Sequence, residues 1–499
     1  MNRVCLMKKD ALSSLWLFTV FFLAAMFLPR LVPQGLFGDG LLYASLARNL
    51  AEGKGSMWAP WFSSGYWLDF ASGAPYFENP PLMIWLEAVF FRIFGDYWWV
   101  EKLYSLLLLV VNAWLIVRIW EIPLRGTDFQ GKYGWFPLLL WYLTTPAVWG
   151  NPNNMMDNNL LTFCLSGLYF ALDGLFSEKN IRWKLTLAGV SVYLGLMTKG
   201  PVGLYPVATP FLFMLTADLP AIRKAGIVKG VLGSAWVGLV ALGLFVLMLA
   251  LVPESRVYFE NYWQKRLGVV LSGVREDAEL TGLARLSIFR ILAKEMAVLI
   301  AAFFILFFIS RRKKMDAGPY RHERRAGLLF LLLGFAATLP IMLSARQNGI
   351  YIIPAMPVFA LAAGYWHLPL LHHWLTASPE KTTRFFEKLR WLTIAGLIVL
   401  SAYVVFLFGK PGRDQALLHD LPMIRQTIPK GEKVLVCEKL MYDQQLHTYL
   451  QRFHHLELTR DTSACRFALA DKNCVPDITA YGFVRVDRGE DTYMVFRKP

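Results

Sequence analysis

Three carboxylates stand beside long apolar segments and are candidates for acid–base chemistry. Asp39 follows the first apolar run, Glu78 lies in the run from Tyr76 to Pro81, and Asp157 lies in an asparagine-rich stretch. Because a carboxylate at a membrane edge is costly to desolvate, its presence there indicates chemistry on a charged or polar molecule. One carboxylate can act as a general base toward a hydroxyl, and a second can orient the acceptor.

Three cations accompany these acids. Lys199 lies in a Lys-Gly-Pro sequence, Arg266 lies in the loop 253–286, and Arg346 lies in the loop 345–349. Lysine and arginine bind phosphate oxygens through charge-assisted hydrogen bonds, which are stronger than neutral ones. Together with the carboxylates, they describe a site for an anionic lipid donor.

A purely structural role is the alternative for each residue. Asp39 and Asp157 would cap the helices that begin beside them, and Glu78 would accept backbone hydrogen bonds in its proline-flanked turn. Lys199 would anchor the end of a helix at the membrane interface, with its apolar stem in the membrane and its ammonium group in water. Arg266 would bind lipid headgroups without specificity.

The composition indicates a polytopic membrane protein. The chain has 499 residues, of which 56% are hydrophobic and only 17% are charged, with a mean hydropathy of +0.41. Crossing about 30 Å of hydrocarbon takes about 20 apolar residues in a helix. We expect about eleven such spans, near 12–30, 97–118, 134–149, 158–176, 184–198, 202–217, 230–252, 287–309, 326–344, 350–366 and 391–408.

Alternate loops carry most of the lysine and arginine, so the net charge of +15 indicates membrane topology rather than nucleic-acid binding. The positive-inside rule places these loops in the cytoplasm, with the candidate residues and the C-terminal segment on the outer face. Residues 82–95 are too short to span and are expected to form an interfacial or re-entrant helix. The chain has no Asn-x-Ser/Thr sequence, which favours a bacterial inner membrane.

The predicted organisation is a helical membrane body over residues 1–409 and a small extracytoplasmic α/β domain over 410–499. In the tail, Lys433–Cys437 and Tyr481–Val486 have strand patterns, and Asp443–Arg452 has a helix pattern. Cys465 and Cys474 are close enough in sequence to form a disulfide. In the external loop 31–96, the stretch from Asp39 predicts an amphipathic helix along the membrane surface.

The order of several short motifs resembles the GT-C class of polyprenyl-phosphate-dependent glycosyltransferases. The resemblance covers residues 15 to 365 and is strongest to the aminoarabinose lipid A transferases and the dolichyl-phosphate-mannose protein mannosyltransferase group. The motifs that carry it are Asp39-x-x-x-Tyr43, Pro75 to Pro81, Met156-Asp157, Thr198 to Pro201, and Tyr351-x-x-Pro354-x-x-Pro357.

The resemblance implies an integral enzyme that moves a sugar from a polyprenyl phosphate carrier to an acceptor on the outer face, with inversion. It implies that Asp39 is the base, that Asp157 orients the acceptor, and that Glu78 shapes the site or binds a divalent metal. Lys199 and Arg266 would grip the carrier phosphate. The further residues expected to contact substrate are Tyr43, Tyr76, Arg346 and Tyr351.

Three positions depart from the family pattern. Gly40 stands where a second acid often follows the first, and Asn79 stands where a lysine often follows Glu78. The stretch from Arg346 to Tyr351 replaces a Lys-x-x-Tyr-Tyr pattern. For this reason, the sugar and the acceptor (lipid A, another glycan or a protein hydroxyl) cannot be carried over from the family.

The rival function is a flippase or transporter of polyprenyl-linked glycans. A transporter would carry ionisable residues deep within several spans, whereas the candidate residues gather near one predicted face. The pairs His372-His373 and His454-His455 lack a third ligand at suitable spacing, so we assign no metal to them. The chain also lacks a phosphate-binding Gly-x-x-x-x-Gly-Lys-Ser/Thr loop, which argues against an ATP-driven transporter.

Overall fold

The computed structural model describes residues 2–65, 75–216, 220–271, 274–275, 278–279, 284–312, 320–344, 347–377, 379–487 and 492–499. The chain divides into two compact units, each assembled from separated stretches of sequence. Unit 1 comprises Met1–Leu28, Leu106–Pro152 and Asp157–Val405, and unit 2 comprises Pro29–Ser105, Asn153–Met156 and Phe406–Pro499. The expected boundary near residue 409 falls within unit 2, and the division into 1–409 and 410–499 stays a prediction.

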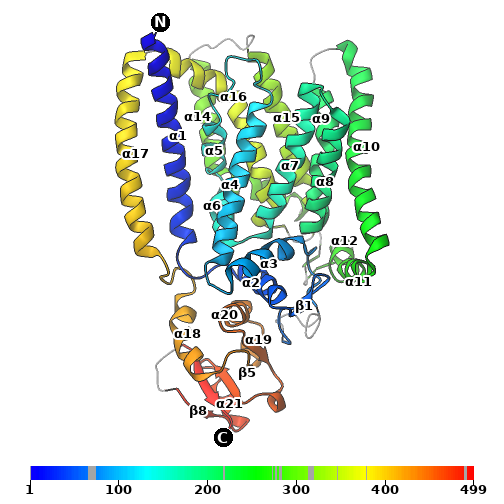
Figure 1. Ribbon diagram of the computed structural model, residues 1–499, viewed down its shortest axis with the longest axis vertical. Coiled ribbons are helices and arrows are strands. Elements are labelled where there is room, and N and C mark those ends of the chain that lie inside the picture. The colour runs from blue at the N-terminus through cyan, green and yellow to red at the C-terminus, as the bar shows by residue number, and fades with distance from the viewer. Residues whose placement is uncertain are drawn as a thin grey trace. The chain divides into compact units, whose positions relative to one another are not determined.

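Unit 1 is helical, and its long helices form a bundle (Figure 1). Four of its α-helices, α1, α4, α7 and α17, have end residues that belong to unit 2. The α-helices are α1 (Asn2–Leu31), α4 (Val100–Glu121), α5 (Trp135–Trp141), α6 (Thr145–Gly150), α7 (Met156–Ser177), α8 (Ile181–Lys199), α9 (Thr209–Thr216), α10 (Pro220–Leu251), α11 (Pro253–Tyr262), α12 (Gly268–Leu271), α13 (Ser287–Glu295), α14 (Ala297–Arg312), α15 (Arg321–Thr338), α16 (Met356–Ala377) and α17 (Pro379–Leu407). The shorter segments are η2 (Asn151–Asn153), η3 (Gly200–Ala208), η4 (Trp263–Leu267), η5 (Ala284–Leu286), η7 (Leu339–Leu343), η8 (Gly349–Ala355), β3 (Val274–Arg275) and β4 (Ala278–Glu279).

The chain is a multi-pass membrane protein. Among the described residues, eight helices are long and apolar enough to cross a membrane, or nine if the bent pair α13 and α14 forms one span. Even the count of nine is below the eleven expected, for two reasons. The stretch 134–149 is divided between α5 and α6, because Pro146 has no N–H to donate to the carbonyl of Tyr142. The stretches 184–198 and 202–217 are counted together as one 36-residue segment, Ile181–Thr216.

That 36-residue segment nevertheless reverses direction at Gly200. Gly200 has a φ of +72°, and a Cβ atom on Gly203 would lie 2.8 Å from the carbonyl carbon of Gly195. Residues eight positions apart in a straight helix are about 12 Å apart, so this contact requires a turn between them. Helix α8 and the η3–α9 segment therefore form a hairpin, as two separate passes would.

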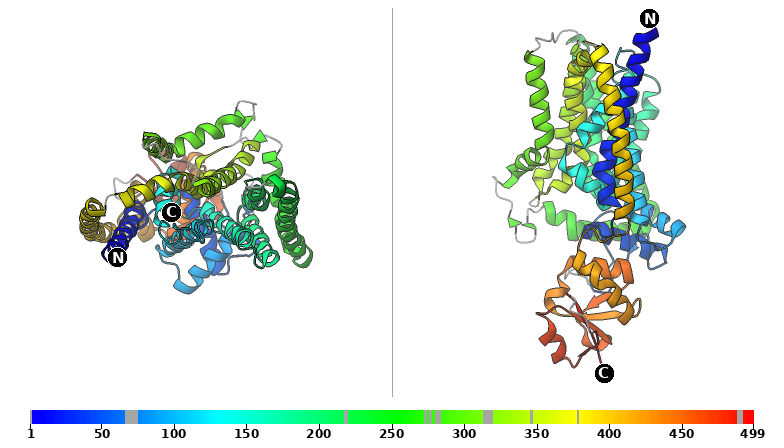
Figure 2. Two further views of the ribbon diagram at one scale, coloured as in Figure 1. Left: turned by 90° about the horizontal axis from the view of Figure 1, so that it is seen from above. Right: turned by 90° about the vertical axis from the view of Figure 1, so that its left-hand side faces the viewer.

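The connection after α4 meets the ends of α7 and α8 within unit 1. Arg125, from the connection after α4, and Lys184 of α8 pair with Asp173 of α7 at 2.5 and 2.6 Å. At the other end of the bundle, α11 and α12 lie across the C-terminal end of α10 (Figure 1). Helices α1 and α17 lie side by side in both views of Figure 2. A Cβ atom on Gly396 of α17 would lie 2.9 Å from the ring of Phe21 of α1.

Unit 2 contains a surface-helix region and a small α/β region. The first has α2 (Gly38–Ala51), β1 (Gly55–Ser56), β2 (Ala59–Pro60) and α3 (Leu82–Phe94). The second has α18 (Gln415–Thr427), β5 (Lys433–Val436), α19 (Glu438–Met441), α20 (Gln444–His454), β6 (Glu457–Thr459), η9 (Thr462–Ala464), β7 (Phe467–Ala470), α21 (Val475–Ala480), β8 (Val484–Arg485) and β9 (Met494–Arg497). The 13-residue α3 is not among the candidate spans, in agreement with the short helix expected over 82–95.

The α/β region confirms the fold class expected for the tail. Its sheet has the order β6-β5-β7-β9-β8, with β5 parallel to β6 and β7, and β9 antiparallel to β7 and β8. The expected strand over 433–437 corresponds to β5, and the expected helix over 443–452 corresponds to α20, which Asp443 caps. The hydrophobic core of this region also includes Leu36 and Leu41, which come from the surface-helix region.

The disulfide joins Cys437 to Cys474, so the expected Cys465–Cys474 pairing is wrong. Cys437 directly follows β5, and Cys474 follows β7 by four residues. Because β5 and β7 are parallel neighbours, their carboxyl ends lie together, and the two Cα atoms are 5.8 Å apart. Cys465 precedes β7 at the opposite end of the strand and is a buried free thiol.

Candidate active site

In unit 1, Asp157 and Lys199 form a buried ion pair. Asp157 lies in the first turn of α7, Lys199 is the last residue of α8, and Lys199 Nζ is 2.5 Å from Asp157 Oδ2. The Asp157 side chain is 0% exposed and that of Lys199 is 12% exposed. An acid at a helix N-terminus and a base at a helix C-terminus each interact favourably with the helix dipole. Asp157 is therefore a helix-start residue whose carboxylate faces a cation.

The Lys-Gly-Pro sequence sets the end of α8. Gly200 adopts a positive φ, which glycine reaches without a steric penalty, and Pro201 cannot continue the helix. A Cβ atom on Gly200 would lie 2.5 Å from the hydroxyl oxygen of Tyr262. Gly200 is thus needed both for the turn and for the close approach of Tyr262. It directly follows Lys199, which carries the positive charge.

Two further predicted residues lie around this pair. Lys199 Nζ is 5.1 Å from the ring centre of Tyr351, in a cation–π contact, and Tyr351 belongs to η8. Arg266 lies in η4, a π-helical segment that directly follows α11. Burial raises the pKa of Tyr262 to about 12, although the nearby charge of Arg266 opposes the shift. Tyr262 is therefore next to both Gly200 and Arg266. A π-helical turn such as η4 is frequent at functional sites.

Arg346 lies outside the described residues. Its predicted contact with phosphate stays a prediction. The structure thus brings four of the predicted residues of unit 1 to one region, namely Asp157, Lys199, Arg266 and Tyr351.

In unit 2, Asp39 lies in the first turn of α2 and is half-buried. The N-cap of α2 is Phe37, which makes no side-chain capping bond, so Asp39 is not the capping residue. The side-chain amide of Gln444 donates to Asp39 Oδ1 at 2.7 Å. Tyr43, one turn later on α2, is buried. The carboxylate of Asp39 therefore accepts a hydrogen bond from a residue of the C-terminal segment.

The residues before α3 are ordered by local hydrogen bonds. The backbone N–H of Tyr76 donates to the carbonyl of Pro60 at 2.8 Å, and the Asn79 amide donates to the Tyr76 hydroxyl at 2.8 Å. Asn79, which stands in place of a family lysine, thus fixes the buried ring of Tyr76. Glu78 lies between these two residues and is half-buried.

The asparagine-rich stretch before α7 explains why Gly40 replaces an acid. Any side chain on Gly40 would overlap the carbonyl oxygen of Asn153. The Asn153 side chain accepts from the N–H of Phe37 at 3.1 Å, and the Asn154 amide donates to the carbonyl of Gly40 at 3.1 Å. Asn153 and Asn154 therefore hold the start of α2, and a second acid next to Asp39 would not fit.

The same amide of Asn154 also donates to Glu87 of α3 at 2.8 Å. Glu87 is fully buried, and burial together with the charge of Glu101 raises its pKa well above the ordinary range. A buried neutral carboxylic acid can accept from Asn154 without the cost of a buried charge. Sequence reasoning missed Glu87 as a site residue, because it stands in an apolar stretch without a motif.

A second missed group is an ion-pair network around Asp96. Arg452 donates to Asp96 at 2.7 Å and to Glu101 at 2.8 Å, and His455 lies 2.9 Å from Asp96. Burial would raise the pKa of Asp96, but the hydrogen bond from His455 and the charge of Arg452 hold it at about 2.

Asp96 also belongs to the one group of three potential metal ligands in the described part of the chain, with Glu52 and His455. Because Asp96 already faces Arg452 and His455, this group is an ion-pair network. Glu78 is not a member of it.

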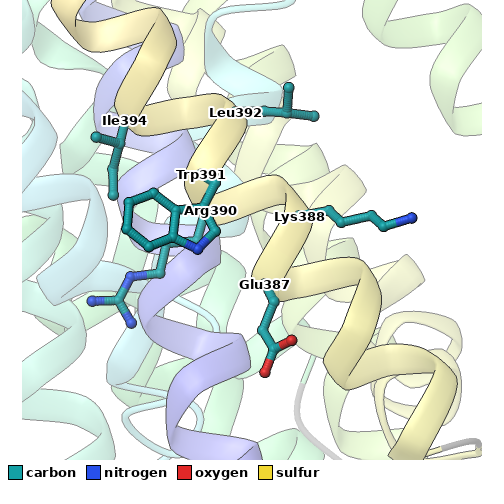
Figure 3. Close-up of a pocket in the computed structure, with 6 residues that line it drawn as sticks. All are labelled: Glu387, Lys388, Arg390, Trp391, Leu392 and Ile394. Atoms are coloured by element: carbon teal, nitrogen blue, oxygen red, sulfur yellow. The ribbon is translucent and has the colours of Figure 1, made fainter.

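A hollow on α17 carries none of the predicted residues. Figure 3 shows that its lining comes from one helix, with Trp391 and Arg390 on one side and Lys388 pointing away from them. Trp391 is exposed on a candidate span, so this surface is expected to face lipid.

Comparisons with known proteins confirm the resemblance. Residues 78–250 match the family described as dolichyl-phosphate-mannose-protein mannosyltransferase, which is about a third of the chain. The crystal structure of ArnT from Cupriavidus metallidurans bound to undecaprenyl phosphate is similar, with a TM-score of 0.62 and 14% identity over 96% of this chain and 97% of that chain. The apo structure of the same ArnT has a TM-score of 0.59 and 17% identity over the same shares. No curated protein sequence matches the chain. At these identities the likeness establishes the fold.

Proposed function

We propose that the chain is an integral membrane glycosyltransferase that moves a sugar from a polyprenyl phosphate carrier to an acceptor hydroxyl. The observation that carries this proposal is the buried Asp157–Lys199 pair beside Tyr351 and Tyr262, in the fold of a protein solved with undecaprenyl phosphate. A sugar phosphodiester already holds an activated leaving group, so its reaction chiefly needs stabilisation of the departing phosphate charge.

Lys199 and Arg266 are proposed to bind the carrier phosphate. Lys199 supplies a positive charge at the end of α8, and the half-buried Arg266 supplies a second one within the same unit. Asp157 fixes Lys199 in the observed rotamer and also balances its charge before the donor arrives. The aromatic ring of Tyr351 gives the ammonium group a further contact, which limits its positions.

Asp39 is proposed to be the general base for the acceptor. A carboxylate within hydrogen-bond reach of a hydroxyl can remove its proton as the sugar is transferred, and direct attack on the anomeric carbon gives inversion. Glu78 is proposed to shape this region or to contribute one ligand to a divalent metal. The reaction is expected on the extracytoplasmic face of a bacterial inner membrane, with lipid A, another glycan or a protein as acceptor.

The test is transfer of a radiolabelled sugar from synthetic polyprenyl phosphate donors to native membrane extracts, with donor binding measured in parallel. We expect wild-type protein to transfer the sugar, and Asp39→Asn to bind the donor but transfer at least about a hundredfold more slowly. Equal transfer by the two proteins would remove Asp39 from the mechanism. If wild type transfers no sugar but moves a lipid-linked sugar across vesicles, the transporter alternative replaces this proposal.

A further inference from the structure

Helix α20 of the C-terminal segment packs along α2, the helix that carries Asp39. Near the start of both helices, Gln444 Nε2 donates to Asp39 Oδ1 at 2.7 Å. Near their ends, Arg48 Nη1 donates to the carbonyl oxygens of Gln451 and Arg452 at 2.9 and 3.0 Å. The two helices therefore run in the same direction and are joined at both ends.

The start of α20 is fixed in place. The Asp443 side chain caps this helix by accepting from the N–H of Leu446 at 3.0 Å. A Cβ atom on Gly38 would lie 3.1 Å from Gln445 Oε1 and 3.4 Å from Gln444 Cδ. The helices thus meet at the first glycine of α2, and this close approach brings the Gln444 amide within reach of Asp39.

The other end is held by a buried cation. Arg48 is 1% exposed, and besides the two carbonyl bonds its Nη2 donates to Gln451 Oε1 at 2.7 Å. Arg452 in turn is anchored by Asp96 and Glu101. Hydrogen bonds that involve a buried charge are costly to break, so α20 has little freedom to slide along α2.

We infer that Gln444 is a positioning residue for the reaction: it holds the Asp39 carboxylate in one rotamer. This inference rests on the proposed role of Asp39 as the base. A neutral amide orients a carboxylate without placing a positive charge on it, which leaves it able to accept a proton. The bond engages Oδ1, and Oδ2 is not held by Gln444. The C-terminal segment then acts as part of the catalytic unit, because a reacting group must be held close to its productive geometry.

The experiment compares three variants of the full chain in the sugar-transfer assay. Gln444→Leu removes the donor at nearly constant volume. Gln444→Glu keeps the shape but donates only when it is protonated. Gln445→Leu is the matched control, because Gln445 is the next residue on α20 and its buried Oε1 has no hydrogen-bond partner among the described residues. The kcat, the donor KM and the Tm are measured for each.

We expect Gln444→Leu to lower kcat about tenfold with donor KM and Tm unchanged, and Gln445→Leu to stay within about twofold of wild type. The kcat of Gln444→Glu, relative to wild type, should rise as the pH is lowered from about 8 to about 6.

Wild-type kcat in Gln444→Leu, or a loss of kcat that only follows a loss of Tm, would overturn the inference while leaving the proposed function intact. A wild-type protein that transfers no sugar would overturn the proposed function, and the inference with it.

Discussion

At the scale of single residues, the chain uses two similar ion pairs between α7 and α8 in different settings. Lys199 pairs with the fully buried Asp157, whereas Lys184 pairs with Asp173, which also binds Arg125. Removing one member of a buried pair leaves an uncompensated charge, at a cost of about 3–5 kcal/mol. The second pair is therefore a natural control for a functional role of the first.

We predict that Lys199→Met weakens binding of the polyprenyl phosphate donor by about 10- to 100-fold, because a charge-assisted contact to phosphate is lost. Lys184→Met should change donor affinity by less than about threefold. The double variant Asp157→Leu/Lys199→Met should regain Tm, since no charge is left unpaired, but not donor binding. If Lys199→Met and Lys184→Met lose donor affinity equally, the Asp157–Lys199 pair is structural.

Sequence reasoning found single residues by their type and by their place at span ends, and it missed their partners. Asp157 and Lys199 were both candidates, but their pairing depends on the α7–α8 hairpin. Gln444 lies 405 residues after Asp39, and a glutamine in a helix of mixed polar and apolar residues carries no motif. Arg48 lies in the stretch predicted to form an amphipathic helix along the membrane surface, and in the structure it is buried against α20.

At the scale of elements, α20 and its C-cap residue His455 carry a pH-sensitive set of histidines. Burial lowers the pKa of His447 from 6.5 to about 4, and burial also lowers the pKa values of His454 and His455. The folded state therefore binds fewer protons than the unfolded state below pH 6.5. The stability that these groups contribute is present above this pH and is lost as the pH falls toward 4.

We predict that the Tm of the protein is lower at pH 5 than at pH 7.5, with His447 alone contributing on the order of 2 kcal/mol to the difference. Asp96 does not confound this window, because its pKa of about 2 keeps it ionised. His447→Gln can still donate to the carbonyl of Met441 and should reduce the difference in Tm between the two pH values. An unchanged difference in this variant would show that His447 is not the titrating group.

The elements themselves were predictable where a local pattern decides them. Helix α20 and strand β5 follow from capping and apolar pattern, and the hairpin at Gly200 follows from its Gly-Pro turn. The apolar run 134–149 predicted one span, whereas the structure divides it between α5 and α6 near Pro146. The short strands β6, β7 and β9 depend on pairing with distant residues, which a single sequence does not reveal.

At the scale of the whole molecule, each unit is assembled from stretches that lie far apart in the sequence. Unit 2 joins the residues around Asp39 to the C-terminal segment, and Leu36 and Leu41 belong to the hydrophobic core of the C-terminal sheet. Composition changes near residue 409, so the sequence favoured a separate tail domain there. Contacts between residues about 400 positions apart, which composition cannot report, group the tail with α2 and α3, and the boundary at 409–410 stays a prediction.

The disulfide ties this arrangement together, because the loop it closes contains α20. Cys437 and Cys474 are 37 residues apart, and closing a loop of this length stabilises a fold by about 4 kcal/mol in the chain-entropy model. Gln444 and Arg452 both lie inside the loop. Restricting the loop should therefore help to keep the Gln444 amide on Asp39.

We predict that Cys474→Ala lowers the Tm more than Cys465→Ala does, and that it also lowers kcat for sugar transfer with little change in donor KM. Both cysteines are buried, so the two substitutions remove similar packing, and only Cys474→Ala opens the loop. Thermal unfolding and steady-state kinetics of the two variants make the comparison. Equal losses of Tm and kcat in both variants would mean that packing, rather than closure of the loop around α20, is what the disulfide region contributes to the position of Asp39.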